Sequence, residues 1–299
     1  MQENKSLLDA RKGGYCFAGM IALYVILSFI GQAVFSAILG ENSTAYVAVC
    51  SLFSVISMSG VLFYAVYGLK INVAQFTGDN FGIIGLPLAS IISCGMFMGL
   101  GYINTTVANI FVDMGLKVSS INVPLDSVWH LLLFSILLAV FPAIVEELFF
   151  RGLLIGSLKN VKSHFAVLVS ALCFALYHSS VAQLVYQFVY GVALGYLFVI
   201  AKSIVPCIFA HFVNNFAVLC FEYFKVNVDL FNPIIIAIGS ACLAVFATVV
   251  YFVYRKRAKM QTDQDKIKVE KGEIKRFFFP TGIFAIIICL TLAIGGLFA

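Results

Sequence analysis

Residues 128–157 read VWHLLLFSILLAVFPAIVEELFFRGLLIGS, an apolar run interrupted by the charged side chains of Glu146, Glu147 and Arg151. As a helix, this run is long enough to cross a hydrocarbon core of about 30 Å. A charged side chain near the bilayer centre costs roughly 2.5–3.5 kcal/mol on insertion scales, so three of them need a physical explanation. The run therefore predicts a membrane-spanning helix that carries a polar site.

Apolar runs of similar length recur along the chain of 299 residues, of which 62% are hydrophobic and only 11% charged. The mean hydropathy of +1.03 is far above that of soluble domains. We therefore predict an all-α fold, a polytopic transmembrane helical bundle of eight or nine spans. The expected spans cover residues 14–39, 45–69, 82–112, 128–157, 164–181, 184–201, 203–223, 233–254 and 278–298.

The basic residues predict the orientation of these spans. Sixteen of the nineteen Lys and Arg residues lie on the cytoplasmic side if the N-terminus is cytoplasmic. The net charge of +5 arises in the loop 255–276, which has nine basic and four acidic residues. We interpret this loop as a topology signal that touches anionic lipid, and we expect no nucleic acid as partner. The eight cysteines lie in apolar spans without a CxxC pair, which argues against disulfides.

The spacing within the first motif separates the roles of its two carboxylates. Glu147 and Arg151 are four residues apart, a spacing at which helical side chains form ion pairs. Glu146 points about 140° away from Arg151 around the helix axis, so it lacks that partner and is the candidate general base. Pro142 cannot donate a backbone hydrogen bond to residue 138, so we also expect a bend or loosened turn before the carboxylates.

Two further patterns place polar side chains in apolar runs: Phe174-Ala-Leu-Tyr-His178 and His211-Phe-Val-Asn-Asn215. His211 and Asn215 share a helical face at four-residue spacing. From the expected cytoplasmic span ends, a rise of about 1.5 Å per residue places Glu146, His178, His211 and Asn215 about 17, 21, 12 and 18 Å deep. These similar depths predict that the side chains meet in one polar site between helices.

Such a site has the groups that hydrolysis of an acyl bond without a covalent intermediate requires. These are a carboxylate that takes a proton from water, a histidine that holds the water, and donors for the developing oxyanion. The same atoms offer a zinc alternative in which His178, His211 and Glu146 are the metal ligands. No HExxH motif is present, and we favour a site without a catalytic metal or other cofactor because every polar residue already has a role.

The three motifs, in this order, resemble the EExxxR, FxxxH and HxxxN signatures of the CPBP family of membrane endopeptidases. This family includes type II CAAX prenyl proteases and bacterial bacteriocin-processing or immunity (Abi-type) relatives, and it is often labelled a metalloprotease group. The resemblance covers about residues 128–220. It implies a four-helix catalytic core over 128–223 and does not extend to the other spans. The apolar runs predict N-terminal transmembrane helices over 1–127 and C-terminal helices over 224–299.

The resemblance also implies residue roles: Glu146 activates water with His178, His211 and Asn215 stabilise the oxyanion, and Glu147 organises the site together with Arg151. The expected protein is a multi-pass intramembrane endopeptidase of a bacterial plasma membrane, acting on a membrane-associated peptide or protein. Two other functions stay open, a proton-coupled transporter and a non-catalytic bacteriocin-immunity or scaffold protein. The sequence does not determine the substrate or the oligomeric state.

Overall fold

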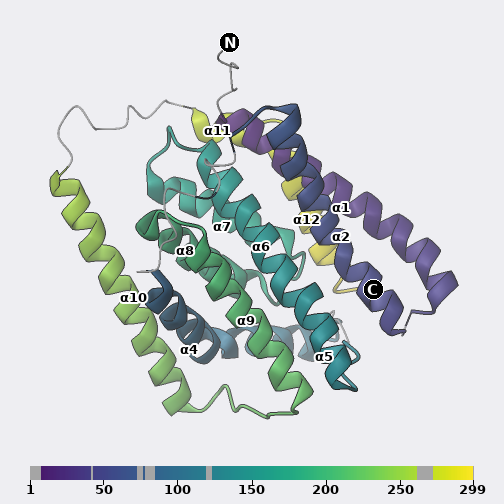
Figure 1. The fold of residues 1–299 in the computed structure, drawn as a ribbon. Helices are drawn as coiled ribbons and strands as arrows, with labels where there is room; N and C mark the ends of the chain where they lie inside the picture. Colours follow the sequence, from purple (N-terminus) through teal and green to yellow (C-terminus); the bar gives the residue numbers. More distant parts are fainter. Residues whose placement is uncertain are drawn as a thin grey trace.

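The computed structural model describes residues 8–41, 43–72, 77, 85–118, 123–260 and 272–298. These residues form helices and their connections, with no β-strand among them, so the predicted all-α fold is confirmed. In chain order (Figure 1), the helices are α1 (Ala10–Leu39), α2 (Thr44–Phe63), η1 (Tyr64–Gly68), α4 (Gly85–Asp113), α5 (Val128–Phe134), η2 (Ser135–Val140), α6 (Phe141–Glu147), η3 (Leu148–Ile155), α7 (Ser163–Tyr177), α8 (Leu184–Ala201), α9 (Val205–Tyr223), α10 (Pro233–Met260), α11 (Glu273–Phe278) and α12 (Thr281–Gly295).

Each of the nine expected spans corresponds to a helix or a continuous helical run within the described residues. Seven of these runs are long and apolar enough to cross a membrane, so a polytopic helical membrane bundle is confirmed. The other two, α7 and α12, are apolar but have 15 residues each. Fifteen residues make about 22 Å of helix, which is less than the thickness of a hydrocarbon core.

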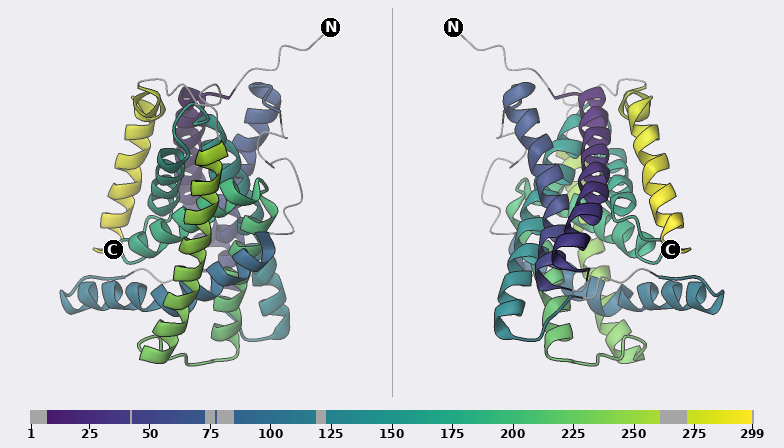
Figure 2. Two further views of the ribbon diagram at one scale, coloured as in Figure 1. Left: turned by 90° about the vertical axis from the view of Figure 1, so that its left-hand side faces the viewer. Right: turned by 90° about the vertical axis from the view of Figure 1, so that its right-hand side faces the viewer.

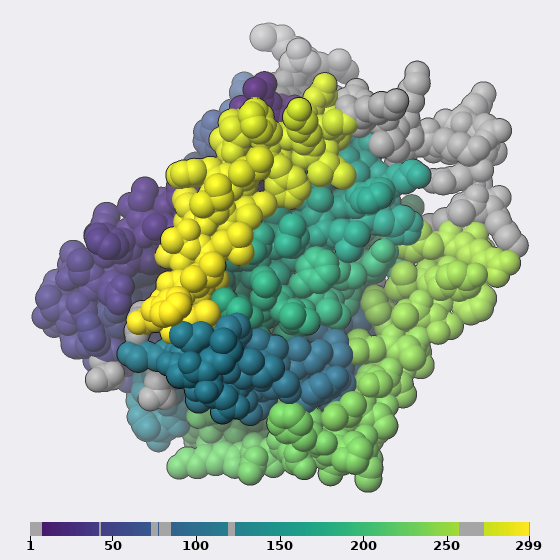
Figure 3. Space-filling model, turned by 180° about the vertical axis from the view of Figure 1, so that it is seen from behind, coloured from purple at the N-terminus to yellow at the C-terminus, as the bar shows by residue number. Residues whose placement is uncertain are grey.

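Most of the long helices run side by side, whereas α4 lies across them (Figure 2). From behind, α4 crosses the surface of the bundle below α12 (Figure 3). The segment after α4 is attached to the segment after α12, because the backbone N–H of Lys117 donates to the carbonyl of Leu297 at 3.0 Å. The helix α4 itself packs against α8, α9 and α10, and α9 carries the third motif.

The contact between α4 and α10 depends on two glycines. A Cβ atom added to Gly239 on α10 would collide with the backbone nitrogen of Gly99 on α4. Two helix backbones approach this closely only where side chains are absent, as in the small-residue contacts of membrane helices. The two glycines therefore allow α4 to lie directly on α10.

The helical run from α5 to η3 contains the irregularity expected at Pro142. It begins with Ser127, whose hydroxyl accepts from the backbone N–H of His130 at 3.2 Å. The π-helical turn η2 ends directly before α6, which has Pro142 in its first turn, and a second π-helical segment, η3, follows Glu147. Wide π-turns inside α-helices often occur at functional sites, and here they flank the two carboxylates.

All eight cysteines are free thiols, in agreement with the prediction from their spacing. Residues 261–271 of the expected basic loop 255–276 lie outside the described residues, whereas residues 255–260 continue α10 and residues 273–276 belong to α11. The predicted cytoplasmic side of the N-terminus stays a prediction.

Candidate active site

The ion pair predicted from the spacing of Glu147 and Arg151 is present and completely buried. Nη1 of Arg151 donates to Oε1 of Glu147 at 2.8 Å, and both side chains are 0% exposed. Nη2 of Arg151 donates to the carbonyl of Gly191 on α8 at 3.4 Å. The α8 carbonyl gives this buried pair one further partner, whereas Oε2 of Glu147 and Nε of Arg151 have none among the described residues, so part of the desolvation cost of the pair is not offset.

His211 is held by Glu147, a contact that the sequence analysis did not predict. Nδ1 of His211 lies 2.8 Å from the same Oε1 atom that accepts from Arg151. One carboxylate oxygen therefore joins a guanidinium on the α5–η3 helix to an imidazole on α9. Because an ionised carboxylate only accepts hydrogen bonds, this contact assigns a proton to Nδ1 and directs Nε2 of His211 away from Glu147.

Glu146 lies on the other side of the His211 ring. Its Oε2 atom is 3.8 Å from Nε2 of His211, which is longer than a hydrogen bond. The residue is 7% exposed, and within the described part of the chain Oε2 has no hydrogen-bond partner. The helical spacing predicts that Glu146 lacks the Arg151 partner that Glu147 has, and the arrangement of these atoms agrees.

His178 occupies the end of α7, where the helix stops. Its Nδ1 atom lies 2.8 Å from the carbonyl oxygen of Phe174, and Ser179 after it has a left-handed backbone with φ of 48°. A carbonyl oxygen can only accept, so Nδ1 of His178 carries the proton. In the neutral ring, Nε2 of His178 is then an acceptor that is suitable for holding a water molecule.

The aromatic ring of Phe174 contacts polar side chains of all three motifs. The guanidinium of Arg151 lies 4.4 Å from the ring centroid, within cation–π distance. The rings of His178 and His211 lie 4.7 and 5.8 Å from it, both edge-on. The structure therefore brings the first residue of the FxxxH motif against the other two motifs, a role that its sequence position alone did not indicate.

Asn215 is the predicted site residue with the most unexpected contact. Its Nδ2 atom donates to the backbone carbonyl of Leu138 at 3.0 Å. Residue 142 is the α-helical hydrogen-bond donor for that carbonyl, but Pro142 has no N–H group. Asn215 thus donates to a carbonyl that receives no hydrogen bond from residue 142. The second hydrogen on Nδ2 of Asn215 remains for another acceptor.

The helix α8 contributes to the site although none of the three motifs lies on it. Besides the Gly191 carbonyl, α8 places the ring of Tyr190 edge-on to His211, with ring centroids 6.0 Å apart. The hydroxyl of Tyr186, one turn earlier, donates to Oδ1 of Asn214 at 2.9 Å. The sequence signal for this contribution of α8 is the pair Tyr186 and Tyr190, which are four residues apart within an apolar span.

The described residues show no preformed metal site. They contain no group of three or more His, Cys, Asp or Glu side chains arranged to hold a metal ion. Of the three ligands expected for zinc, Oε2 of Glu146 lies 3.8 Å from Nε2 of His211, and Nδ1 of His178 lies against the carbonyl of Phe174. The zinc alternative stays a prediction.

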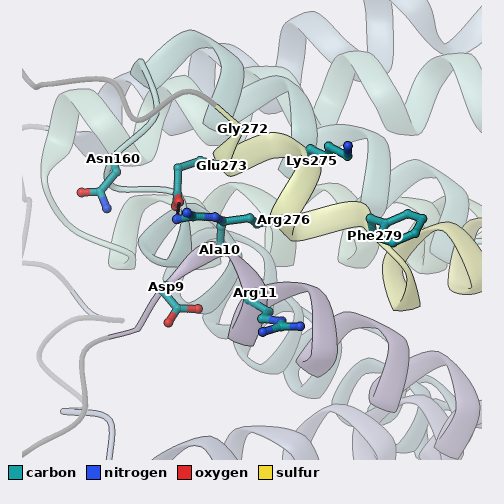
Figure 4. A pocket seen from close by; sticks show the side chains of 9 residues that line it. All are labelled: Asp9, Ala10, Arg11, Asn160, Gly272, Glu273, Lys275, Arg276 and Phe279. Atoms are coloured by element: carbon teal, nitrogen blue, oxygen red, sulfur yellow. Dashed lines mark hydrogen bonds and ion pairs between the residues drawn. The ribbon is translucent and has the colours of Figure 1, made fainter.

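A cavity of about 660 Å³ lies elsewhere, between the start of α1 and α11 (Figure 4). Its wall includes Asp9, Arg11 and Glu273, and Oε1 of Glu273 accepts from Nη1 of Arg276 at 2.7 Å. No residue of the three motifs lines it. The polar site described above is therefore separate from this cavity.

Fold and site together define a helical membrane protein with a buried carboxylate–imidazole centre. Residues 128–217, 90 of the 299 in the chain, match the family model described as Type II CAAX prenyl endopeptidase Rce1-like. The match begins at α5 and ends within α9, so it contains all six predicted site residues. It confirms the resemblance expected from the three motifs for this segment, and it supports a peptide hydrolase. A comparison with curated proteins found no match.

Proposed function

We propose that this protein is an intramembrane endopeptidase that hydrolyses a peptide bond of a membrane-associated peptide or protein. The observation that carries the proposal is the position of Glu146. Its carboxylate is buried and faces Nε2 of His211, and among the described residues Oε2 has no hydrogen-bond partner. A carboxylate in this state is suited to take a proton from a water molecule.

The reaction follows from the groups around Glu146. Water gives a proton to Glu146 while its oxygen attacks the carbonyl carbon of the substrate, and His178 holds the water through Nε2. The negative charge that develops on the carbonyl oxygen is stabilised by an amide hydrogen of Asn215 and by Nε2–H of His211, whose ring carries a proton on both nitrogens in this step. The carbon–nitrogen bond then breaks, and the proton on Glu146 passes to the leaving amine.

Three further residues would act indirectly. Glu147 and Arg151 hold His211 in place through the shared Oε1 atom, and Phe174 packs against the rings of both histidines. None of these three needs to touch the substrate. The proposed location is a bacterial plasma membrane with the N-terminus in the cytoplasm, as the distribution of basic residues suggests.

The test uses purified protein and three probes. These are an internally quenched peptide that ends in a farnesylated Cys-aliphatic-aliphatic-X sequence, the same peptide without the farnesyl group, and peptides prepared from solubilised host membranes. We expect cleavage by the wild type and a loss of about 100- to 10,000-fold in Glu146→Gln, because a general base contributes a factor of that size. Preference between the first two probes decides whether a prenyl group is recognised.

Equal cleavage by Glu146→Gln would exclude Glu146 as the general base. If folded wild-type protein cleaves none of the probes, the endopeptidase function is contradicted, and the transporter or immunity function would replace it. A chelator such as 1,10-phenanthroline tests the metal alternative in the same assay. We expect an unchanged rate, whereas a loss that added zinc reverses would show that a metal is required.

A further inference from the structure

We infer that Tyr186 and Asn214 are positioning residues that orient the amide of Asn215 for the reaction. This inference rests on the proposed function, because it concerns an amide that would stabilise the oxyanion. Neither residue belongs to the three motifs: Tyr186 lies on α8, and Asn214 precedes the last residue of the HxxxN motif.

The two residues and Asn215 form a directed chain of hydrogen bonds. The hydroxyl of Tyr186 donates to Oδ1 of Asn214 at 2.9 Å. Nδ2 of Asn214 points to Oδ1 of Asn215 at 3.4 Å, and Nδ2 of Asn215 donates to the carbonyl of Leu138 at 3.0 Å. Each donor therefore leads to the acceptor of the next group, from α8 through α9 to the π-turn before Pro142.

This direction matters because an asparagine amide can turn over and exchange its oxygen and nitrogen. If the amide of Asn215 turned, its oxygen would face the Leu138 carbonyl and its N–H groups would face away from the site. Asn214 opposes this by placing an N–H group against Oδ1 of Asn215, and Tyr186 keeps Asn214 in that orientation. In a site of low dielectric constant, such chains strengthen each of their hydrogen bonds.

Burial of the chain supports the inference. Tyr186 and Asn214 are 6% and 8% exposed, so water does not readily replace their partners. The ring of Tyr186 also packs near that of Tyr190, whose ring contacts His211. One face of α8 therefore contacts both residues to which we assign oxyanion stabilisation, Asn215 through Asn214 and His211 through Tyr190.

The first experiment compares Tyr186→Phe with a matched control on the same helix, Tyr196→Phe. The hydroxyl of Tyr196 lies 3.2 Å from Nδ1 of His164 at the start of α7, so the control also removes a tyrosine hydrogen bond. With the peptide that the wild type cleaves fastest, we expect kcat to fall about 5- to 50-fold in Tyr186→Phe, less than the loss of a whole oxyanion donor. KM should stay within about twofold, since the ground-state contacts do not change.

A double variant separates positioning from packing. In a protein that already carries Asn214→Ala, adding Tyr186→Phe should lower kcat by less than about twofold. The Tyr186 hydroxyl then has no Asn214 amide to orient. Additive effects of the two substitutions would overturn the inference. The inference is also overturned if Tyr186→Phe and Tyr196→Phe have the same kcat. If Glu146→Gln is inactive in that same assay, the proposed function stays intact.

A second measurement does not require activity. In spectra of protein with ¹⁵N-labelled asparagine, Tyr186→Phe should shift the side-chain NH₂ signals of both Asn214 and Asn215, whereas Tyr196→Phe should shift neither. If the Asn215 signal does not move, the chain does not orient this amide and the inference is wrong. If the signals move but no peptide is cleaved by the wild type, the orientation is correct and only the proposed function fails.

Discussion

At the scale of single residues, the site depends on one carboxylate oxygen with two partners. Oε1 of Glu147 accepts from Arg151 and from His211, both at 2.8 Å, and all three side chains are at most 4% exposed. When a buried charge loses its partner, nothing offsets the free energy that it cost to remove this charge from water. The three residues are therefore expected to stabilise the fold as one unit as well as to place His211.

We predict that Arg151→Met destabilises the protein by about 3–5 kcal/mol, because it leaves the Glu147 carboxylate without its buried cation. The free energy of unfolding in detergent, measured by denaturant titration, checks this. Exposed Lys159→Met is the matched control and should change it by less than about 0.5 kcal/mol. The double variant Glu147→Gln with Arg151→Met should recover part of the loss. Equal stability of Arg151→Met and Lys159→Met would contradict the prediction.

At the scale of elements, the helical run from α5 to η3 is long enough to cross a membrane and is irregular at its centre. It is a long apolar helix, and it also contains two π-helical segments around Glu146 and Glu147. Pro142 contributes to this irregularity because it removes a backbone donor, and Asn215 on α9 uses the carbonyl of Leu138. The irregular helix and α9 are thereby connected at the level of the site.

We predict that Pro142→Ala lowers kcat without lowering stability. The alanine supplies an N–H group that competes with Asn215 for the Leu138 carbonyl, so the amide loses its anchor. Proline inside a helix costs about 3 kcal/mol, so its removal should leave the free energy of unfolding unchanged or higher. Assays of kcat and of unfolding on the same samples test both parts.

The control for this substitution is Pro233→Ala. Pro233 is exposed at the first residue of α10, where proline fits a helix without cost. Neither kcat nor stability should change there. Loss of stability in Pro142→Ala, with kcat per folded molecule unchanged, would mean that the proline serves packing alone.

At the scale of the whole molecule, helices outside the matched segment support the site. The hydroxyl of Ser93 on α4 donates to the carbonyl of Ala210 at 3.0 Å, directly before His211 on α9. The helix α2 packs against α6 and the two π-helical segments, which carry or flank the carboxylates. The segment 128–217 thus holds the reacting groups, while helices before and after it fix their surroundings.

We predict that Gly239→Ala destabilises the protein by roughly 1–3 kcal/mol, because the new methyl group must separate α10 from α4. Gly19→Ala on α1 is the matched control, since nothing lies within 4 Å of the added Cβ atom. That change should stabilise by about 0.5–1 kcal/mol through helix propensity. Denaturant titrations of both variants give the comparison, and a Gly239→Ala protein as stable as Gly19→Ala would refute a close helix contact.

The sequence by itself determined the fold class, the helices and the identity of the polar residues. These follow from local properties: long apolar runs predict helices in a membrane, and four-residue spacing predicts the ion pair of Glu147 and Arg151. The bend near Pro142 was also predictable, because the missing N–H group is a property of one residue. Motif order predicted the family match over residues 128–217.

Only the tertiary structure decided which atoms of these residues meet. The contact of His211 with Glu147, the position of Asn215 on the Leu138 carbonyl and the chain through Tyr186 and Asn214 all join separate helices. Helical periodicity places a side chain on a face, but it does not set the rotation and depth of one helix against another. Those depend on packing between distant parts of the chain, as in the direct contact of Gly99 with Gly239.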